Sequence, residues 1–384
     1  MTSEFPVISE SKALAKAHLA ANWDVVRGIS TRLHADPETG WQEVRAHRML
    51  TTLLSERGFD VDARAGGLDT AFHARMGGGP LHVAFVAEYD ALPGLGHACG
   101  HNLIAAAAIG AALMVQEADR GRALTVHVLG TPAEEGGGGK IVMMEAGEFD
   151  GLDAALMMHP GPVDAPRAEP MAVAHWRVTY HGVSAHAGTY PHLGVNAADA
   201  FTVAQVAIGL LRQQLPSTAR VHGVVTTAGT APNAIPDTAS GRWYVRARTL
   251  AELCDIETRI RACFQAGAVG TGCELEVELE SAPYSEFRTD DEMLDMFVAN
   301  AALLGRDMTA EAPEGAAAMA SASTDMGNVS QVLRAIHPYL GIDSLPAVNH
   351  QREFADAAVG PAADAALRDG ATALAWTALD LAGR

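Results

Sequence analysis

Apolar residues recur along the chain with two different periods. They follow helical spacing at 11–33 and again at 44–57, with Pro37 marking the break between these segments. Three short apolar runs then predict buried strands at 81–86, 124–129 and 154–158, and an alanine-rich helix is predicted at 102–117. Strands alternating with a helix in this order predict a parallel sheet covered by helices.

The pattern changes near residue 173. Strands are predicted at 176–180, 221–227, 243–248 and 273–279, with helices at 196–214 and 250–266, an order typical of a ferredoxin-like α+β domain. Helices return at 290–304 and 362–382. We therefore expect an α/β fold whose mostly parallel sheet, sandwiched by helices, is built from 1–172 and 281–384, with a lid domain inserted at 173–280.

Composition narrows the choice of partners. A chain of 384 residues that is 48% hydrophobic and 19% charged suits two globular domains. The formal net charge of -19 disfavours nucleic acid and anionic membranes, so a small-molecule substrate is expected. The N-terminal residues carry no signal-peptide pattern, and no apolar run is long enough to span a membrane, which predicts a cytoplasmic protein.

Polar side chains follow each of the three predicted strands of the parallel sheet. Glu88 and Asp90 come after the first strand, Glu134 and Glu135 after the second, and His159 after the third. In an open α/β sheet, ligands bind at the edge formed by the carboxyl ends of the strands. These side chains therefore mark a candidate site. His159 by itself could be an ordinary core histidine, but its place at the end of the third strand favours a ligand.

Cys99 and His101 lie between the first strand and the helix that follows it. A lone cysteine is usually a buried small residue, but a thiolate and an imidazole two residues apart are typical metal ligands. Two other interpretations are weaker. The glycines of 94–100 nearly form a dinucleotide-binding turn, although the last glycine comes one residue late. A thiol nucleophile would need a facing base and an orienting third group, and neither is evident.

Glu134 and Glu135 precede a run of four glycines. An isolated pair of glutamates is usually a solvated turn, but here an apolar strand delivers the pair to the ligand edge. One carboxylate can then bind an ion while its neighbour takes a proton from an activated water. The sequence therefore favours metal-assisted hydrolysis.

Several motifs together resemble the amidohydrolase branch of the aminoacylase and carboxypeptidase-like co-catalytic metallopeptidases. This branch includes hippurate hydrolases, auxin-conjugate hydrolases and aminobenzoyl-glutamate hydrolases. The matching motifs are His-Ala-Asp-Pro-Glu-Thr-Gly at 34–40, Asp-Ala-Leu-Pro at 90–93, His-Ala-Cys-Gly-His at 97–101, Glu-Glu-Gly at 134–136, His159 and Asn-His at 349–350. The short loop before His97 and the presence of Asn102 make the chain similar to the sub-branch of β-alanyl-lysine-type dipeptidases.

The resemblance implies a zinc-exopeptidase-like catalytic domain that binds two divalent ions. In it, Cys99 bridges the ions, Glu134 is the general base, and the other metal ligands are His101, Glu135, His159 and His350. Zinc suits a thiolate bridge, and manganese, cobalt or nickel could occupy the same ligands. His350 is assigned mainly from the resemblance.

The resemblance also assigns roles to three residues of the inserted domain. His186, in a Ser-Ala-His turn, is similar to a family histidine that reaches the active site of a partner subunit. Asn233 and Arg246 match residues that hold the substrate, and a strand guanidinium calls for an anionic partner such as a carboxylate. A homodimer formed through the lid domain is therefore expected.

The predicted activity is hydrolysis of an N-acyl amino acid or small peptide conjugate that carries a free carboxylate. The alternatives are a dipeptidase of the β-alanyl-lysine type and a catalytically silent metal-binding scaffold on the same fold. Glu134 argues against the scaffold, because a protein without catalytic activity has no use for a general base.

Overall fold

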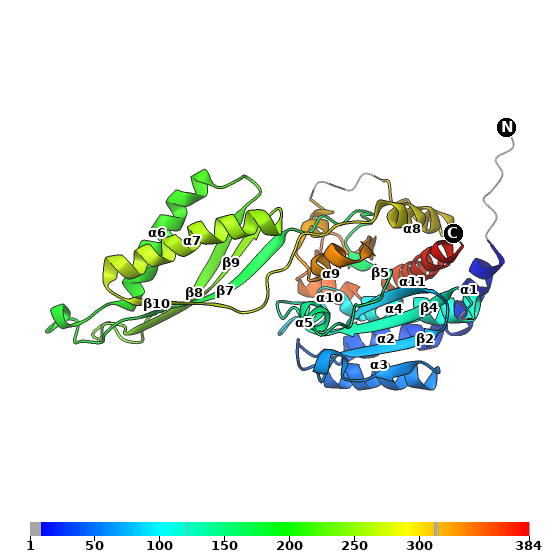
Figure 1. The fold of residues 1–384 in the computed structure, drawn as a ribbon. Coiled ribbons are helices and arrows are strands. Elements are labelled where there is room, and N and C mark those ends of the chain that lie inside the picture. The colour runs from blue at the N-terminus through cyan, green and yellow to red at the C-terminus, as the bar shows by residue number, and fades with distance from the viewer. Residues whose placement is uncertain (1–8, 121, 311–312, 314, 384) are drawn as a thin grey trace. The chain divides into compact units, whose positions relative to one another are not determined.

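The computed structural model of the protein describes residues 9–120, 122–310, 313 and 315–383. These residues form two compact units (Figure 1). One unit combines the chain up to Glu169 with the chain from Phe287, and the other is Pro170–Glu286. The units overlap the two predicted segments, whereas the lid and dimerisation roles of the inserted unit stay predictions.

A six-stranded mixed sheet forms the centre of the first unit. Its strand order is β1-β2-β4-β3-β5-β11. The last four strands in this order are parallel to one another, and β2 runs antiparallel to both of its neighbours, β1 and β4. The strands are β1 (Asp60–Asp62), β2 (Phe72–Gly77), β3 (Leu81–Glu88), β4 (Leu124–Thr131), β5 (Ala154–Leu156) and β11 (Arg334–Ile336). Beyond β5 and β11 the chain continues into a parallel pair, β6 (His159–Gly161) and β12 (Tyr339–Gly341).

Helices cover both faces of this sheet, as Figure 1 shows. On β3, Val83 and Phe85 belong to a hydrophobic cluster that includes residues of α4 and α11, while Ala84 and Val86 belong to a second cluster with residues of α5 and α9. The helices are α1 (Glu10–Ala21), α2 (Trp23–Ala35), α3 (Val44–Glu56), α4 (His101–Asp119), α5 (Gly139–Glu145), α8 (Asp291–Leu303), α9 (Met326–Val332), α10 (Arg352–Ala357) and α11 (Pro361–Ala382), with short 3-10 turns at Ala65–Gly67 and Ala318–Ser321. The expected α/β class with a mostly parallel, helix-covered sheet is confirmed.

The segment predicted as one helix at 11–33 is two helices. Asn22 ends α1, because its backbone N–H donates to the carbonyl oxygens of His18 and Leu19, and its side-chain amide also donates to His18. A side chain that bonds to the preceding turn competes with helix continuation. The apolar pattern continues into α2 and therefore hides the break.

The antiparallel strands β1 and β2 escaped prediction. In β2 the polar residues His73 and Arg75 alternate with buried Phe72 and Ala74, and β1 has only three residues. Such short, half-polar segments carry little periodic signal, so these two strands do not stand out in the sequence.

The inserted unit is a four-stranded antiparallel sheet with α6 and α7 on one face (Figure 1). Its strand order, β10-β7-β9-β8, is that of a ferredoxin-like domain, as expected from the sequence. A separate core containing Trp176, Trp243 and Phe264 holds the sheet and helices together. The elements are β7 (Ala172–His181), α6 (Ala197–Leu211), β8 (Arg220–Thr227), β9 (Thr238–Ala247), α7 (Leu250–Thr271) and β10 (Glu274–Leu279), with short 3-10 turns at Pro191–Leu193 and Arg212–Gln214.

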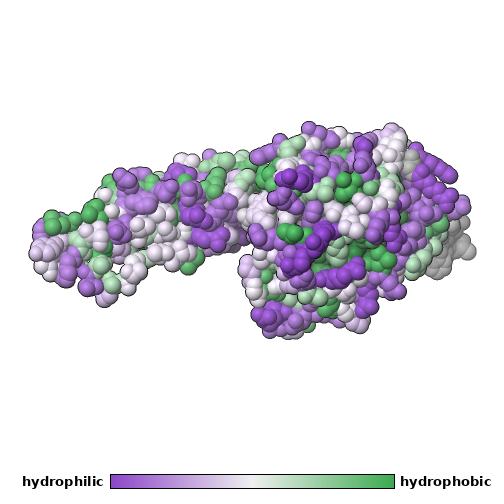
Figure 2. Space-filling model, turned by 90° about the horizontal axis from the view of Figure 1, so that it is seen from below, coloured by the Kyte–Doolittle hydropathy of each residue, from purple (hydrophilic) through white to green (hydrophobic). Residues whose placement is uncertain are grey.

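The surface of both units is mixed in character. On the face seen in Figure 2, hydrophilic side chains are spread over each unit with hydrophobic groups between them. Within the described part of the chain, none of the helices has the length and apolar character needed to cross a bilayer.

Candidate metal centre

The parallel strands bring the predicted ligands to one edge of the sheet. β3 ends at Glu88, β4 ends at Thr131, four residues before Glu135, and α4 begins at His101. Gly100 makes the turn into α4 with φ +80°, and a Cβ there would lie 2.7 Å from Pro160 Cγ. Glycine is therefore needed between Cys99 and His101 to pass close to the segment that carries His159.

Cys99, His101 and His159 form one buried group of candidate ligands. One donor atom from each lies within 4.8 Å of the other two. The Cys99 Sγ atom is 3.6 Å from His159 Nε2, and the His159 ring is held by a 2.7 Å contact between its Nδ1 and the Pro160 carbonyl oxygen. This arrangement points Nε2 of His159 toward the thiol.

Cys99 also belongs to a second group, with Glu135 and His350. The His350 Nε2 atom is 3.5 Å from Glu135 Oε1. The backbone N–H of His350 donates to the Ala98 carbonyl oxygen at 2.8 Å, which ties the C-terminal loop to the Cys99 turn. His350 has φ +69°, a left-handed backbone that costs free energy for a non-glycine residue and is often found at functional sites.

Asp90 orients this part of the site without belonging to either group. Its carboxylate lies 3.0 Å from His101 Nδ1 and accepts a hydrogen bond from the Glu135 N–H at 3.1 Å. A carboxylate on one ring nitrogen of a histidine fixes the tautomer and leaves the other nitrogen as a ligand. Nε2 of His101 is therefore the atom available to a metal.

Two tests on these residues favour a bound cation. His101 Nε2 and Glu135 Oε1 are buried, and neither has a hydrogen-bond partner among the described residues. Burial and the charge of Glu135 raise the pKa of the Cys99 thiol well above its usual range. That shift opposes a free thiolate nucleophile, whereas a cation beside the sulfur would stabilise the thiolate. Because the two groups of candidate ligands share Cys99, they suit two ions with a thiolate between them.

Glu134 differs from its neighbour. Its side chain is buried, and its Oε2 atom is 4.0 Å from His101 Nε2. Burial and the charges of Glu88 and Glu135 raise the pKa of Glu134 well above its usual range. A carboxylate with a raised pKa beside the candidate ligands has the affinity for protons that a general base needs.

The three predicted residues of the inserted unit do not all lie together. The strand segments of His186 and Asn233 are paired, because Ala187 N–H donates to the Asn233 carbonyl oxygen at 2.9 Å and His186 bridges with Ala234. Both side chains are exposed at the end of the sheet where β9 begins. Arg246 lies near the opposite end of β9, roughly 30 Å away at about 3.3 Å per residue.

Sequence reasoning missed a buried ion cluster next to the candidate ligands. Lys140 has no exposed surface, and its Nζ atom lies 2.5 Å from Glu88 Oε1 and 2.6 Å from Asp325 Oδ1. Glu88 Oε2 is in turn 3.5 Å from His101 Nε2. Glu88 was noticed from its place at a strand end, but a lysine after a glycine run carries no signal of burial.

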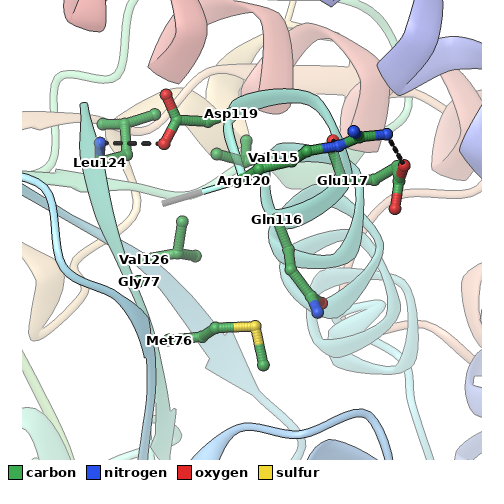
Figure 3. A pocket seen from close by; sticks show the side chains of 9 residues that line it. All are labelled: Met76, Gly77, Val115, Gln116, Glu117, Asp119, Arg120, Leu124 and Val126. Atoms are coloured by element: carbon green, nitrogen blue, oxygen red, sulfur yellow. Dashed lines mark hydrogen bonds and ion pairs between the residues drawn. The ribbon is translucent and has the colours of Figure 1, made fainter. Parts of the chain in front are cut away.

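A hollow of about 390 Å³ lies elsewhere in the first unit (Figure 3). Its lining comes from β2, β4 and the end of α4, and includes Met76, Val115 and Val126. The Asp119 carboxylate at its rim accepts a hydrogen bond from Leu124 N–H. None of the predicted site residues lines this hollow, so it is separate from the candidate metal centre.

Comparison with known proteins matches residues 84–373 to the family model described as peptidase family M20/M25/M40. The chain is 40% identical to a mouse Xaa-Arg dipeptidase over 372 residues, which cover 92% of this chain and 84% of the relative. It is 33% identical to one component of the Escherichia coli p-aminobenzoyl-glutamate hydrolase, over 66% of this chain and 57% of the relative. A Bacillus subtilis dinuclear metal-binding peptidase of the M20 family shares the fold, with a TM-score of 0.68 at 21% identity and coverage of 94% and 99%.

Proposed function

Because the chain belongs to peptidase family M20/M25/M40 and is therefore a hydrolase of amide bonds, we propose that it uses two divalent ions to release an amino acid from an N-acyl amino acid or dipeptide. The family match confirms the resemblance drawn from the motifs. The observation that carries the proposal is the pair of ligand groups sharing Cys99, in which one buried thiol lies beside histidines and a carboxylate.

Five residues would hold the ions: Cys99, His101, Glu135, His159 and His350. Two bound divalent ions would polarise the scissile carbonyl and lower the pKa of a water molecule. Zinc suits the thiolate and imidazole donors, while manganese, cobalt or nickel could be held by the same set.

Glu134 is the residue proposed to move the proton. Its carboxylate takes a proton from the attacking water and then donates it to the leaving amine, so that the base is regenerated in each cycle. Asp90 keeps the His101 ring oriented during this cycle through its contact with Nδ1. The buried surroundings of Glu134 also limit competing contacts with bulk water.

Two substrate classes fit the proposal. Arg246 is partly buried on β9, where a guanidinium favours a carboxylate partner, so a free carboxylate on the leaving amino acid is expected. The names of the relatives support both an N-acyl amino acid and a dipeptide. The 40% identity to an Xaa-Arg dipeptidase favours the dipeptide as the second candidate, in agreement with the β-alanyl-lysine type.

The placement of the inserted-unit residues supports a homodimer. His186 and Asn233 lie too far from Arg246 for all three to reach one substrate from a single chain. We therefore assign the first two to the active site of a partner subunit. Helix α6 also exposes Val206 and Leu210, at 60% and 71%, and a second copy would cover these apolar side chains.

A panel assay tests the proposed reaction. The protein is incubated with N-acyl amino acids and dipeptides that have free or amidated carboxylates, and the released amine is measured with and without a chelator. Chelator-sensitive release from substrates with a free carboxylate is expected. Release that continues unchanged in excess chelator would overturn metal dependence, and equal rates on the amidated substrates would overturn the role of Arg246.

A further inference from the structure

Lys140 is an unusual residue for the interior of a protein, since a buried ammonium is costly unless it is paired. Its Nζ atom forms ion pairs with Glu88 at 2.5 Å and with Asp325 at 2.6 Å, and all three side chains have at most 1% of their surface exposed. The Lys140 backbone N–H donates to the other Asp325 oxygen at 3.0 Å. The lysine is therefore fixed at both its backbone and its ammonium group.

Without the lysine, its surroundings would resemble a cation site. Carboxylate oxygens of Glu88, Glu134 and Asp325 lie within 4.8 Å of one another, close enough to hold one ion together. Three buried carboxylates are the hard oxygen donors that manganese or magnesium prefers. The cluster also adjoins the metal centre, because Glu88 Oε2 is 3.5 Å from His101 Nε2.

We propose that Lys140 is a positioning residue whose ammonium occupies this acid cluster and keeps a third metal ion away from Glu134. This inference rests on the proposed role of Glu134 as the base. A carboxylate that coordinates a metal has committed a lone pair and accepts a proton less readily. An ammonium attached to α5 offsets part of the negative charge of the cluster without drawing Glu134 into a metal–ligand bond, and it is not exchanged with ions in solution.

The inference is tested by counting metal. Wild type, Lys140→Met and the more polar Lys140→Gln are saturated with Mn²⁺, desalted and analysed for metal per chain. We expect about two ions in wild type and about three in the neutral variants, since two ions form the proposed centre. Turnover of the variants should fall at least tenfold as free Mn²⁺ rises, and a weak chelator should restore it, whereas wild type should keep its activity.

Two matched variants separate this role from a loss of fold. Lys12→Met breaks another lysine ion pair of this unit, with Asp380 at 2.7 Å, and should leave the count at about two. Lys140→Met combined with Asp325→Asn removes one carboxylate of the acid cluster and should also return the count to about two. The Gln side chain of Lys140→Gln can still form a hydrogen bond, so this variant supplies the metal count if Lys140→Met does not fold.

The possible failures are distinguishable. If wild type and both neutral variants bind the same two ions and respond alike to free Mn²⁺, the role of Lys140 is overturned while the binuclear centre stands. If wild type binds fewer than two ions, the proposed function itself fails, whatever the variants do.

Discussion

Two adjacent glutamates face different surroundings at the candidate metal centre. Glu135 lies 3.5 Å from His350 and its backbone N–H is held by Asp90, so we place its carboxylate with the proposed ligands. Glu134 is buried, and burial with the charge of Glu88 raises its pKa. At the residue scale, this contrast is the basis for separating a ligand from a base.

The contrast predicts different defects for the two amide variants. Glu134→Gln should retain both ions but lose roughly 100- to 10,000-fold in kcat, because the amide cannot accept the proton. Glu135→Gln should lose metal first. Elemental analysis and kcat, measured on the same preparations, check this. Equal metal loss in both variants, or normal turnover in Glu134→Gln, would reverse the assignment.

A second buried carboxylate, Glu43, predicts a pH-dependent stability. Burial and the charge of Asp90 raise the pKa of Glu43 from 4.5 to about 7, although it accepts a hydrogen bond from Ala133 N–H. The folded state therefore holds this proton more tightly than the unfolded chain. Its contribution to stability is fully present below pH 4.5 and is lost as the pH rises through about 7, a change of at most roughly 3 kcal/mol.

Glu43→Gln removes this titration and keeps an acceptor for Ala133. Relative to wild type, its free energy of unfolding should therefore increase between pH 5 and pH 8. Denaturant unfolding of both proteins at the two pH values measures the difference. A difference that stays constant over this range would show that Glu43 does not titrate in the folded protein.

The residue-scale chemistry was only partly predictable. Cys99, His101 and His159 stood out because each follows a strand or begins a helix at the ligand edge. Lys140 and Asp325 did not, because they are 185 positions apart and meet only in the folded chain. A charged residue in a sequence is usually solvated, so burial of an ion pair cannot be expected from spacing.

At the element scale, three histidines link neighbouring strands of the mixed sheet. His127 on β4 contacts His73 on β2 at 2.8 Å and His82 on β3 at 3.0 Å, and His73 in turn contacts Glu148 at 2.9 Å. While the histidines are neutral, His73 and His127 can each donate to one neighbour and accept from the other, and His82 can donate to His127. Burial, followed by the charges of His73 and His82, lowers the pKa of His127 to about 3, and Arg75 acts in the same direction.

This histidine chain predicts acid sensitivity. Since the pKa of His127 is lowered in the folded state, its contribution is fully present above pH 6.5 and is lost as the pH falls toward about 3. In that window, the free energy of unfolding falls by about 1.4 kcal/mol per pH unit from this group. His127→Leu should therefore show a shallower fall in unfolding free energy between pH 6.5 and 5 than wild type. Parallel curves for the two proteins would exclude His127 as the source.

Some elements of the first unit were predictable from long apolar runs. The strands β3 and β4 and the helix α4 were found because long apolar runs leave a clear pattern. The antiparallel strands β1 and β2 and the break at Asn22 were missed, since polar residues and one side-chain hydrogen bond decide them. The placement of His350 depends on its backbone hydrogen bond to Ala98, which no sequence period encodes.

At the scale of the whole molecule, the proposed dimer makes a complementation test possible. His186→Ala and Glu134→Gln should each be inactive as pure proteins. In a mixed dimer, the chain with intact Glu134 would receive His186 from its partner, which rebuilds one complete site. Activity should therefore return on mixing under conditions where subunits exchange. Exchange without any return of activity would show that His186 does not act across the interface.

Metal titration of the metal-free protein tests the central claim most directly. Hydrolysis of an N-acyl amino acid or dipeptide should be absent without metal, rise with added ions and level off at about two equivalents per chain. Cys99→Ala, which lacks the shared thiolate, should need more metal and stay well below wild-type turnover. Full activity at one equivalent, or wild-type turnover in Cys99→Ala, would contradict a binuclear centre bridged by Cys99.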